Sequence, residues 1–232
     1  MSDLSPFPIT ERWPADRADA IQLYSFPTPN GVKVSILLEE LGLDYEPHLV
    51  TLSDSDVKSP AFLSLNPNNK IPAIIDPAGP NGEAVRLFES GAILIYLADK
   101  AQSPLLGQGN RRAQVIQWLM FQMSGVGPMF GQLGYFLKFA GAEIEDPRPR
   151  ERYVAEAKRL LAVLEKELAT RDWIAGDYSI ADIAIAPWLR ALDYYGAKEL
   201  VGWDDLTHVP AYLDRFLARP AVQRGLKIPA AR

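Results

Sequence analysis

The sequence predicts an α/β domain followed by an all-helical domain, because the spacing of apolar residues changes along the chain. Up to Lys100, short apolar runs of strand length alternate with helical periods. From Arg111 onward, the apolar residues recur almost wholly at helical spacing. Between these two stretches, residues 101–110 contain one proline and two glycines and therefore predict a linker.

The α/β domain is predicted to open with a strand over residues 21–26. This apolar and aromatic run ends at Pro27, which has no backbone N–H to donate. Residues 31–41 then carry apolar side chains at helical spacing, and Gly42 closes the helix. Before the strand, residues 1–20 contain three prolines and no sustained period, so we predict an N-terminal extension there.

The remaining elements of this domain are predicted as a strand, a short helix, two strands and a helix, over residues 45–52, 60–65, 73–76, 84–88 and 91–100. The last two strands are separated by a Pro- and Gly-rich turn, which is typical of antiparallel neighbours. The order βαβαββα is the thioredoxin-like arrangement. We therefore predict a thioredoxin-like domain over residues 21–100 and an all-α domain over residues 111–232.

The all-α domain contains one clear helix start. Ser179 and Asp182 have the spacing of a capping box, with Asp182 in place of the usual Glu. In such a box each side chain accepts a hydrogen bond from the backbone of the other residue. We interpret this pair as structural rather than functional.

Charge and residue usage exclude several classes of function. A formal net charge of −5 argues against binding nucleic acid through a broad basic face. The chain has no cysteine, so any thiol chemistry must use a borrowed thiol. The only histidines, His48 and His208, do not stand among acids at a ligand-like spacing, so we expect no metal. Residues 1–20 have no apolar run, so we expect no secretory signal, no membrane partner and a cytoplasmic location.

Four short motifs together resemble the glutathione transferases. In order they are Thr28-Pro29-Asn30-Gly31, Asn68-Asn69-Lys70-Ile71-Pro72-Ala73, Phe88-Glu89-Ser90-Gly91-Ala92-Ile93 and Tyr178-Ser179-Ile180-Ala181-Asp182-Ile183. The resemblance covers residues 21–225. Within the family, the chain resembles more specifically the bacterial Nu class and the Ure2-like proteins, which are known for glutathione-dependent disulfide reductase activity. It implies the glutathione transferase fold, glutathione as co-substrate, a small disulfide or electrophile as second substrate, and a homodimer.

The resemblance also implies how glutathione is bound. Glu89 is expected to take the ammonium and Ser90 the α-carboxylate of the γ-glutamyl end, beside the positive end of a helix. The backbone of Ile71, before a cis Pro72, is expected to pair with the cysteinyl amide, and Lys70 to meet the glycine carboxylate. As alternatives, Glu89 and Ser90 only cap a helix, and Lys70 is a solvated charge.

Thr28 and Asn30 are the pair expected to activate the thiol. A hydrogen bond donated to a thiolate lowers the pKa of the thiol. Thr28 aligns with the hydroxyl that does this in many transferases, and the Asn30 amide can donate to sulfur or hold a second glutathione. Which of the two activates the thiol stays open. Tyr24 lies within the first strand and fits the core better, although a shifted alignment would make it a rival.

Two further positions qualify the resemblance. Arg152 matches an arginine that reaches glutathione in the Nu class, while a solvated helix charge explains it equally well. Residues 53–58 replace a glycine-rich segment that holds a glutamine in close relatives, and Val57 cannot supply the hydrogen bonds of that glutamine. We therefore expect altered recognition of the glycine end.

Together these features predict an enzyme that reduces disulfide bonds with a bound glutathione thiolate. Conventional conjugation of glutathione to an electrophile is the first alternative, since it uses the same thiolate. A non-catalytic, glutathione-binding regulatory protein is the second. The intact pair Glu89-Ser90 and the run Lys70-Ile71-Pro72 argue against the second alternative, because a scaffold has no need of them.

Overall fold

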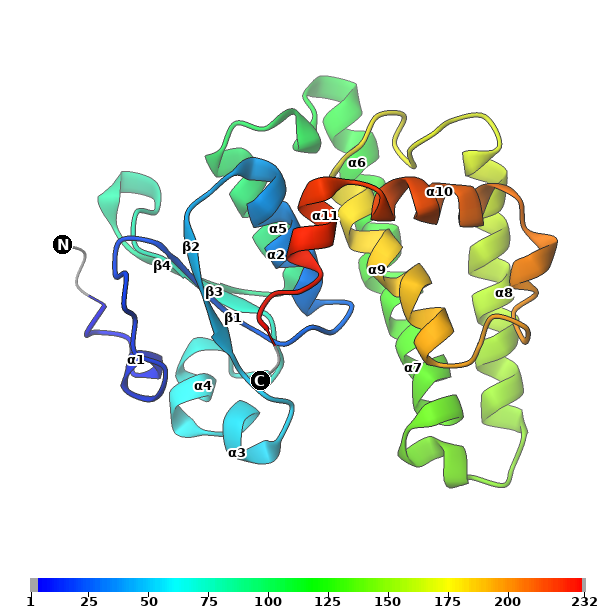
Figure 1. Ribbon diagram of the computed structural model, residues 1–232, viewed down its shortest axis with the longest axis horizontal. Helices are drawn as coiled ribbons and strands as arrows, with labels where there is room; N and C mark the ends of the chain where they lie inside the picture. Colours follow the sequence, from blue (N-terminus) through cyan, green and yellow to red (C-terminus); the bar gives the residue numbers. More distant parts are fainter. Residues whose placement is uncertain (1–3, 231–232) are drawn as a thin grey trace. The chain divides into compact units, whose positions relative to one another are not determined.

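The computed structural model describes residues 4–230 and divides them into two compact units (Figure 1). The first unit contains the described residues up to Gln102 together with those from Pro220 onward, and the second contains Ser103–Arg219. The predicted combination of a thioredoxin-like domain and a helical domain is confirmed. Residues 1–3 of the predicted extension and residues 231–232 of the predicted helical domain lie outside the described residues.

A mixed sheet of four strands, in the order β2-β1-β3-β4, forms the centre of the first unit. Its strands are β1 (Ile21–Ser25), β2 (Tyr45–Leu49), β3 (Ala73–Asp76) and β4 (Val85–Phe88). β1 is parallel to β2 and antiparallel to β3, and β3 is antiparallel to β4. All residues of β1 and β3 are buried, because these strands lie inside the sheet and helices cover both faces.

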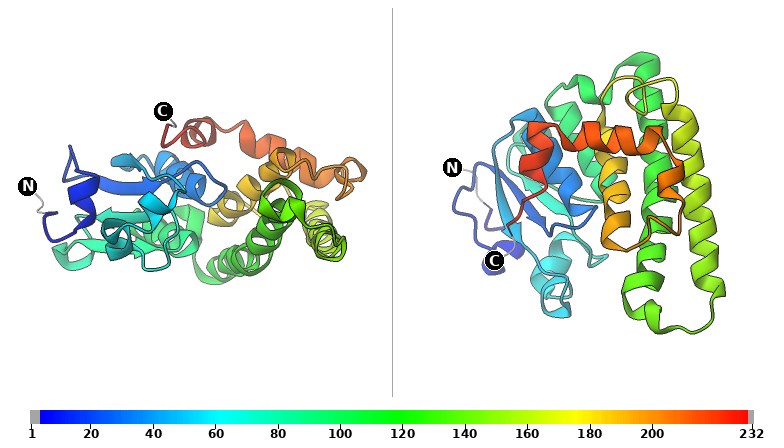
Figure 2. Two further views of the ribbon diagram at one scale, coloured as in Figure 1. Left: turned by 90° about the horizontal axis from the view of Figure 1, so that it is seen from below. Right: turned by 45° about the vertical axis from the view of Figure 1, so that its right-hand side comes forward.

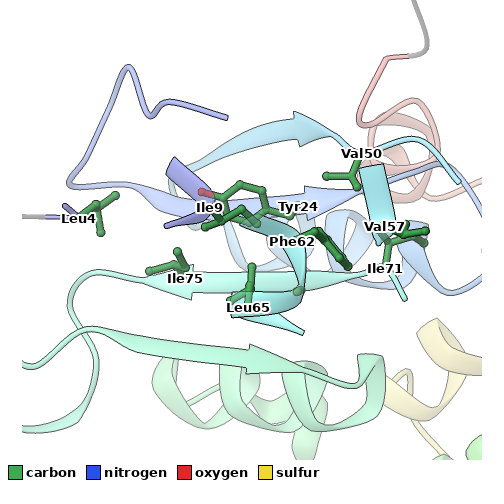
Figure 3. Close-up of a cluster of buried hydrophobic side chains, with 10 residues drawn as sticks. Leu4, Ile9, Tyr24, Val50, Val57, Phe62, Leu65, Ile71 and Ile75 are labelled. Atoms are coloured by element: carbon green, nitrogen blue, oxygen red, sulfur yellow. The ribbon is translucent and has the colours of Figure 1, made fainter. Parts of the chain in front are cut away.

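One face of the sheet carries α2 (Gly31–Leu41) and α5 (Ser90–Lys100), which pack against each other. The opposite face carries α1 (Ile9–Arg12), α3 (Asp54–Val57) and α4 (Pro60–Leu65). Figure 3 shows the core on that second face, where Tyr24 and Ile75 of the strands meet Ile9 of α1 and Phe62 of α4. The short 3-10 helix η1 (Pro80–Gly82) joins β3 to β4.

The described part of the N-terminal extension is packed onto the sheet. Ile9 is fully buried in the cluster of Figure 3. Trp13 Nε1 donates to Leu49 O of the edge strand at 3.1 Å, and Arg12 forms an ion pair with Asp56 at 2.5 Å. The extension therefore completes the core on the face that α2 and α5 leave open.

The second unit is almost wholly helical. Its helices are η2 (Pro104–Leu106), α6 (Gly109–Phe121), α7 (Gly127–Lys138), η4 (Ala140–Glu143), α8 (Arg148–Leu168), α9 (Ile180–Tyr194), η5 (Trp203–Asp205) and α10 (His208–Leu217), with a π-helical turn, η3 (Gln122–Val126), between α6 and α7. The predicted capping box begins α9: Ser179 N–H donates to Asp182 Oδ2 at 2.8 Å, and Ser179 Oγ accepts from Ala181 N–H at 3.3 Å.

The chain returns to the first unit after Arg219. There α11 (Pro220–Gly225) packs against α2, and both lie side by side in Figures 1 and 2. Ser35 Oγ donates to Gly225 O at 2.7 Å, and a Cβ at Gly225 would lie 2.6 Å from Ile36 Cα. The sequence placed residues 220–232 with the helical domain. The described part of this segment instead packs on the first unit, because its contacts are with a helix about 190 residues earlier.

Candidate functional site

Three segments of the first unit meet at one edge of the sheet. Ala73, at the start of β3, pairs with Tyr24 near the end of β1 and with Phe88 at the end of β4. Antiparallel neighbours place the end of one strand beside the start of the next. The turn after β1, the residues before β3 and the start of α5 therefore share this edge. These segments carry every predicted site residue except Arg152.

A hydroxyl and a glycine shape the turn after β1. Thr28 Oγ1 accepts a hydrogen bond from Gly31 N–H at 3.1 Å, and its hydroxyl proton can still be donated to another group. A Cβ at Gly31 would lie 1.9 Å from Phe26 O, so glycine is needed for α2 to start this close to β1. Thr28 and Asn30 are both half-buried. Two side chains that can donate hydrogen bonds thus stand beside the start of α2.

The start of α5 combines an exposed acid with a buried hydroxyl. Glu89 precedes the helix with a φ of 72°, an uncommon conformation for a residue other than glycine, and its side chain is exposed. Ser90, the first residue of α5, is 3% exposed. The first turn of α5 contains no acidic residue, so no carboxylate within that turn offsets the positive end of the helix.

The loop before β3 holds the third group of predicted residues. The peptide bond between Ile71 and Pro72 is cis. Asn66, which is 2% exposed, donates from Nδ2 to Lys70 O at 2.6 Å and accepts from Asn68 N–H at 2.9 Å. Asn66 therefore fixes the backbone of the loop, and the Lys70 side chain is exposed.

A hollow of about 310 Å³ adjoins this loop, between it and α3. Lys58, Lys70 and Ile71 line it together with Asp54, and the Lys58 ammonium forms an ion pair with Asp54 Oδ2 at 2.8 Å. Val57, whose side chain was expected to alter recognition here, also lines the hollow. Sequence reasoning missed Lys58. The available signal was its place next to Val57, in the segment where this chain departs from its relatives.

Lys33 is a further residue that sequence reasoning missed. It is the third residue of α2 and is 0% exposed, and its Nζ donates to Ser90 Oγ at 3.3 Å. Burial lowers the pKa of the Lys33 ammonium to about 7, and the carboxylate of Glu89 acts in the opposite direction. The available signal was its position four residues before Leu37, on the apolar face of the helix.

Two other candidates are not part of these three segments. Arg152 belongs to α8 of the second unit and its side chain is exposed, so a contact with glutathione stays a prediction. Tyr24 is fully buried in the cluster of Figure 3, as expected for a core aromatic residue. His48 stacks on Tyr24 with ring centroids 4.6 Å apart, and it hydrogen-bonds Gln22 Oε1 at 2.7 Å.

Residues 4–230 contain neither a cluster of metal ligands nor a helix that could span a membrane. No group of three or more His, Asp or Glu side chains in that range could hold a metal ion. None of the helices there combines the length and the apolar character needed to cross a bilayer.

Two family models match the chain, one for each part. The model described as "Glutathione S-transferase, N-terminal domain" matches residues 19–99, and the one described as "Glutathione S-transferase, C-terminal domain" matches residues 129–220. Among curated proteins, the chain is 43% identical over 211 residues to the disulfide-bond oxidoreductase YfcG of Escherichia coli, covering 89% of this chain and 94% of that protein. It is 41% identical over 216 residues to the disulfide-bond oxidoreductase YghU of the same organism, covering 88% and 73%.

Two solved structures are similar over nearly the whole chain. A glutathione transferase from Burkholderia graminis, with two glutathione molecules bound per subunit, is 62% identical with a TM-score of 0.97, covering 100% of this chain and 98% of that one. A glutathione transferase from Pseudomonas putida, with one glutathione disulfide bound per subunit, is 59% identical with a TM-score of 0.96, covering 98% and 99%.

Proposed function

This chain belongs to the glutathione S-transferase family, and we propose that it reduces small disulfides with a bound glutathione thiolate. One observation carries this proposal. In a chain without cysteine, one edge of the thioredoxin-like sheet holds two hydrogen-bond donors, an acid beside a helix start and a hollow bordered by lysines. The similarity to two disulfide-bond oxidoreductases favours reduction over conjugation.

The charged residues along this edge determine the orientation in which we propose that glutathione binds. Glu89 attracts the ammonium of the γ-glutamyl end, and Ser90 with the start of α5 takes its α-carboxylate. The backbone of Ile71, before Pro72, pairs with the cysteinyl amide in the manner of an added strand. Lys70 meets the glycine carboxylate at the other end.

Lys58 and Arg152 are proposed to add further contacts to this binding site. We propose that Lys58 supplies a second cation for the glycine carboxylate, since it borders the same hollow as Lys70. This offsets the loss of the glutamine that Val57 and its neighbours replace. We also propose that Arg152 contributes a contact to a glutathione carboxylate, which the resemblance to the Nu class supports.

Thr28 and Asn30 are proposed to hold the sulfur as thiolate. The thiolate attacks one sulfur of the disulfide, which forms a glutathione mixed disulfide and releases the other half as a thiolate that takes up a proton. A second glutathione thiolate then attacks the mixed disulfide, which forms glutathione disulfide and releases the second thiol. Relatives solved with two glutathiones or with glutathione disulfide support room for both.

The test is a pair of assays on one preparation. We expect turnover of 2-hydroxyethyl disulfide at millimolar glutathione, with weak conjugation of chlorodinitrobenzene. The reverse ratio would make conjugation the main reaction. Thr28→Ala and Asn30→Ala, measured separately, identify the activating group, because the variant that lacks it loses kcat while it keeps its affinity for glutathione.

We further propose a Nu-class or Ure2-like homodimer that works in the cytoplasm. The absence of cysteine and the expected dependence on reduced glutathione support a reducing compartment. The resemblance to the Nu class supports the dimer, and two-fold dimers are the commonest oligomers. Sedimentation at micromolar concentration tests it, and a single species with the 25.7 kDa mass of one chain would contradict it.

A further inference from the structure

The N-terminal extension reaches the segment around α3 through the side chain of Arg12. This last residue of α1 donates from Nη2 to Asp56 Oδ1 at 2.5 Å, although the two residues are 44 positions apart in the chain. The Arg12 guanidinium also lies 5.0 Å from the ring centroid of Trp13, whose Nε1 donates to Leu49 O at 3.1 Å. Trp13 therefore ties this part of the extension to the edge strand, and Arg12 extends from there to α3.

Asp56 joins this ion pair to the turn that leads into α3. Its Oδ2 accepts hydrogen bonds from Thr51 N–H at 2.8 Å and from Thr51 Oγ1 at 2.6 Å, while its Oδ1 accepts from Arg12. Burial alone would raise the pKa of Asp56, but these hydrogen bonds outweigh it and hold that pKa below its ordinary value. The Asp56 side chain is 14% exposed, so solvent screens its bond with Arg12 less than a bond on the open surface. One carboxylate thus connects the turn to the extension.

Residues 52–58 contribute one wall of the hollow that adjoins the loop before β3. Val57 and Lys58 line the hollow from this side, and Val57 directly follows Asp56. Val57 is 7% exposed and belongs to the buried cluster that also contains Ile71, a residue of the opposite wall. A shift of Asp56 would therefore move Val57 relative to Ile71 and change the shape of the hollow.

The two walls of the hollow are held in place in different ways. Asn66 fixes the loop that contains Lys70 through hydrogen bonds to the backbone of that same loop. The other wall contains α3, which has only four residues. A helix of this length does not hold its shape alone, because one turn of hydrogen bonds cannot offset the cost of nucleation. It depends on tertiary contacts, and the bond from Arg12 is a contact of this kind.

We propose that Arg12 is a positioning residue for the glycine end of glutathione, because it holds Asp56 and with it the wall formed by residues 52–58. This inference rests on the proposed function, since it takes the glycine carboxylate to lie in the hollow beside Lys70. Arg12 acts through Asp56 and not on the sulfur. Its loss is therefore expected to weaken binding of the glycine end and to leave the chemical step unchanged.

The test compares glutathione with γ-glutamylcysteine, which lacks the glycine, by calorimetry on the full chain. For Arg12→Gln we expect the Kd and KM for glutathione to rise about threefold, as for the loss of a partly exposed ion pair. The kcat and the Kd for γ-glutamylcysteine should change less than about 1.5-fold. Arg17→Gln is the matched control, because it removes an ion pair between the same extension and Asp44, directly before the edge strand. It should leave both Kd values unchanged.

A double-mutant cycle tests whether Arg12 acts through Asp56. We expect Asp56→Asn to weaken glutathione binding at least as much as Arg12→Gln, since it also alters the bonds with Thr51. In that background Arg12→Gln should add little, because the ion pair is already lost. Independent losses from the two changes would overturn the proposal, as would equal weakening for glutathione and γ-glutamylcysteine. If Arg12→Gln does not fold, Arg12→Met is measured in the same cycle.

The binding data keep this test apart from that of the proposed reaction. If the wild type binds glutathione but reduces no disulfide, the proposed reaction fails and the two Kd values still decide the role of Arg12. If the wild type reduces disulfides and Arg12→Gln binds glutathione as tightly as the wild type, the role of Arg12 fails and the reaction stands. A wild type that binds γ-glutamylcysteine as tightly as glutathione would also overturn this role, since the hollow would then not hold the glycine end.

Discussion

Two fully buried charged residues occupy the same place in two helices of this protein, with opposite signs. Asp182 is the third residue of α9 in the second unit, and Lys33 is the third residue of α2 in the first. An acid at a helix start is favoured by the positive end of the helix, whereas a cation there is not. The positive end of the helix therefore favours the charge of Asp182 and disfavours the charge of Lys33.

The partners of Asp182 account for its structural role. Its carboxylate accepts from Ile174 N–H at 3.0 Å, from Ser179 N–H at 2.8 Å and from Ser179 Oγ at 2.9 Å. Burial raises the pKa of Asp182 to about 6 in spite of these bonds, so burial is the stronger effect. All these partners belong to the protein itself. Lys33 instead donates from Nζ to the side-chain hydroxyl of Ser90 at 3.3 Å, across to another helix of the first unit.

Removal of the Asp182 carboxylate should cause the largest change. We expect Asp182→Ala to lower the free energy of unfolding by about 3 kcal/mol, because the buried amides of Ile174 and Ser179 lose their acceptor. Urea unfolding followed by circular dichroism measures this loss. Asp204→Ala, at an exposed acid, is the control. A loss below about 0.5 kcal/mol would remove the contrast between the two helices.

Removal of the Lys33 charge should change the free energy of unfolding in the opposite direction. We expect Lys33→Met to raise the free energy of unfolding by about 2 kcal/mol at pH 7, since an apolar side chain of similar length replaces a buried cation. The same urea experiment measures the gain, with glutathione absent. A fall of similar size would mean that Lys33 supports the fold, and the two helix starts would then be alike.

The pH dependence of stability should distinguish the wild type from Lys33→Met. The folded protein releases the Lys33 proton at a pKa of about 7, well below the ordinary value of 10.5 that the unfolded chain keeps. Between these values the unfolded state binds more protons, so this group makes the wild type more stable as the pH rises. We expect the advantage of the variant to shrink by at most about 1 kcal/mol between pH 7 and pH 8. A difference that is constant over this range would contradict the lowered pKa.

The side-chain hydrogen bonds to the first-turn amides of the two helices should stabilise the protein by about the same amount. Thr28 accepts from Gly31 N–H at the start of α2, and Ser179 accepts from Ala181 N–H at the start of α9. We expect Thr28→Val and Ser179→Ala each to lower the free energy of unfolding by about 0.5–1 kcal/mol. Matching losses would place the difference between the helices at their third residues, and clearly unequal losses would place it in these hydrogen bonds.

Local signals in the sequence were enough for most of the fold. The strand that ends before Pro27, the helix closed by Gly42 and the box at Ser179 and Asp182 each depend on residues within a few positions, and the structure has all of them. The glutathione motifs were also local, and the register of β1, β3 and β4 gathers their residues at one edge. Their individual roles stay proposals.

Features that depend on distant contacts were missed. Lys33 and Ser90 are 57 residues apart in the chain, and no pattern around either residue links them. Position 33 lies on the apolar face of α2, four residues before Leu37, where a lysine is expected to snorkel to solvent and not to be fully buried. Lys58 became a candidate only when the fold placed it beside Lys70. The packing of residues 220–230 on α2 likewise cannot be predicted from the residues close to them in the sequence.

The packing of α11 on α2 has a consequence for folding during translation. Gly225 lies against the backbone of Ile36, and Ser35 is bonded to Gly225 O, so α2 obtains part of its cover from residues that lie 190 positions later in the chain. Domains usually fold in turn as they leave the ribosome, the N-terminal one first. In this protein α2 therefore lacks part of its cover until residues 220–225 have been synthesised, and a chain cut short after the helical unit leaves the first unit incomplete.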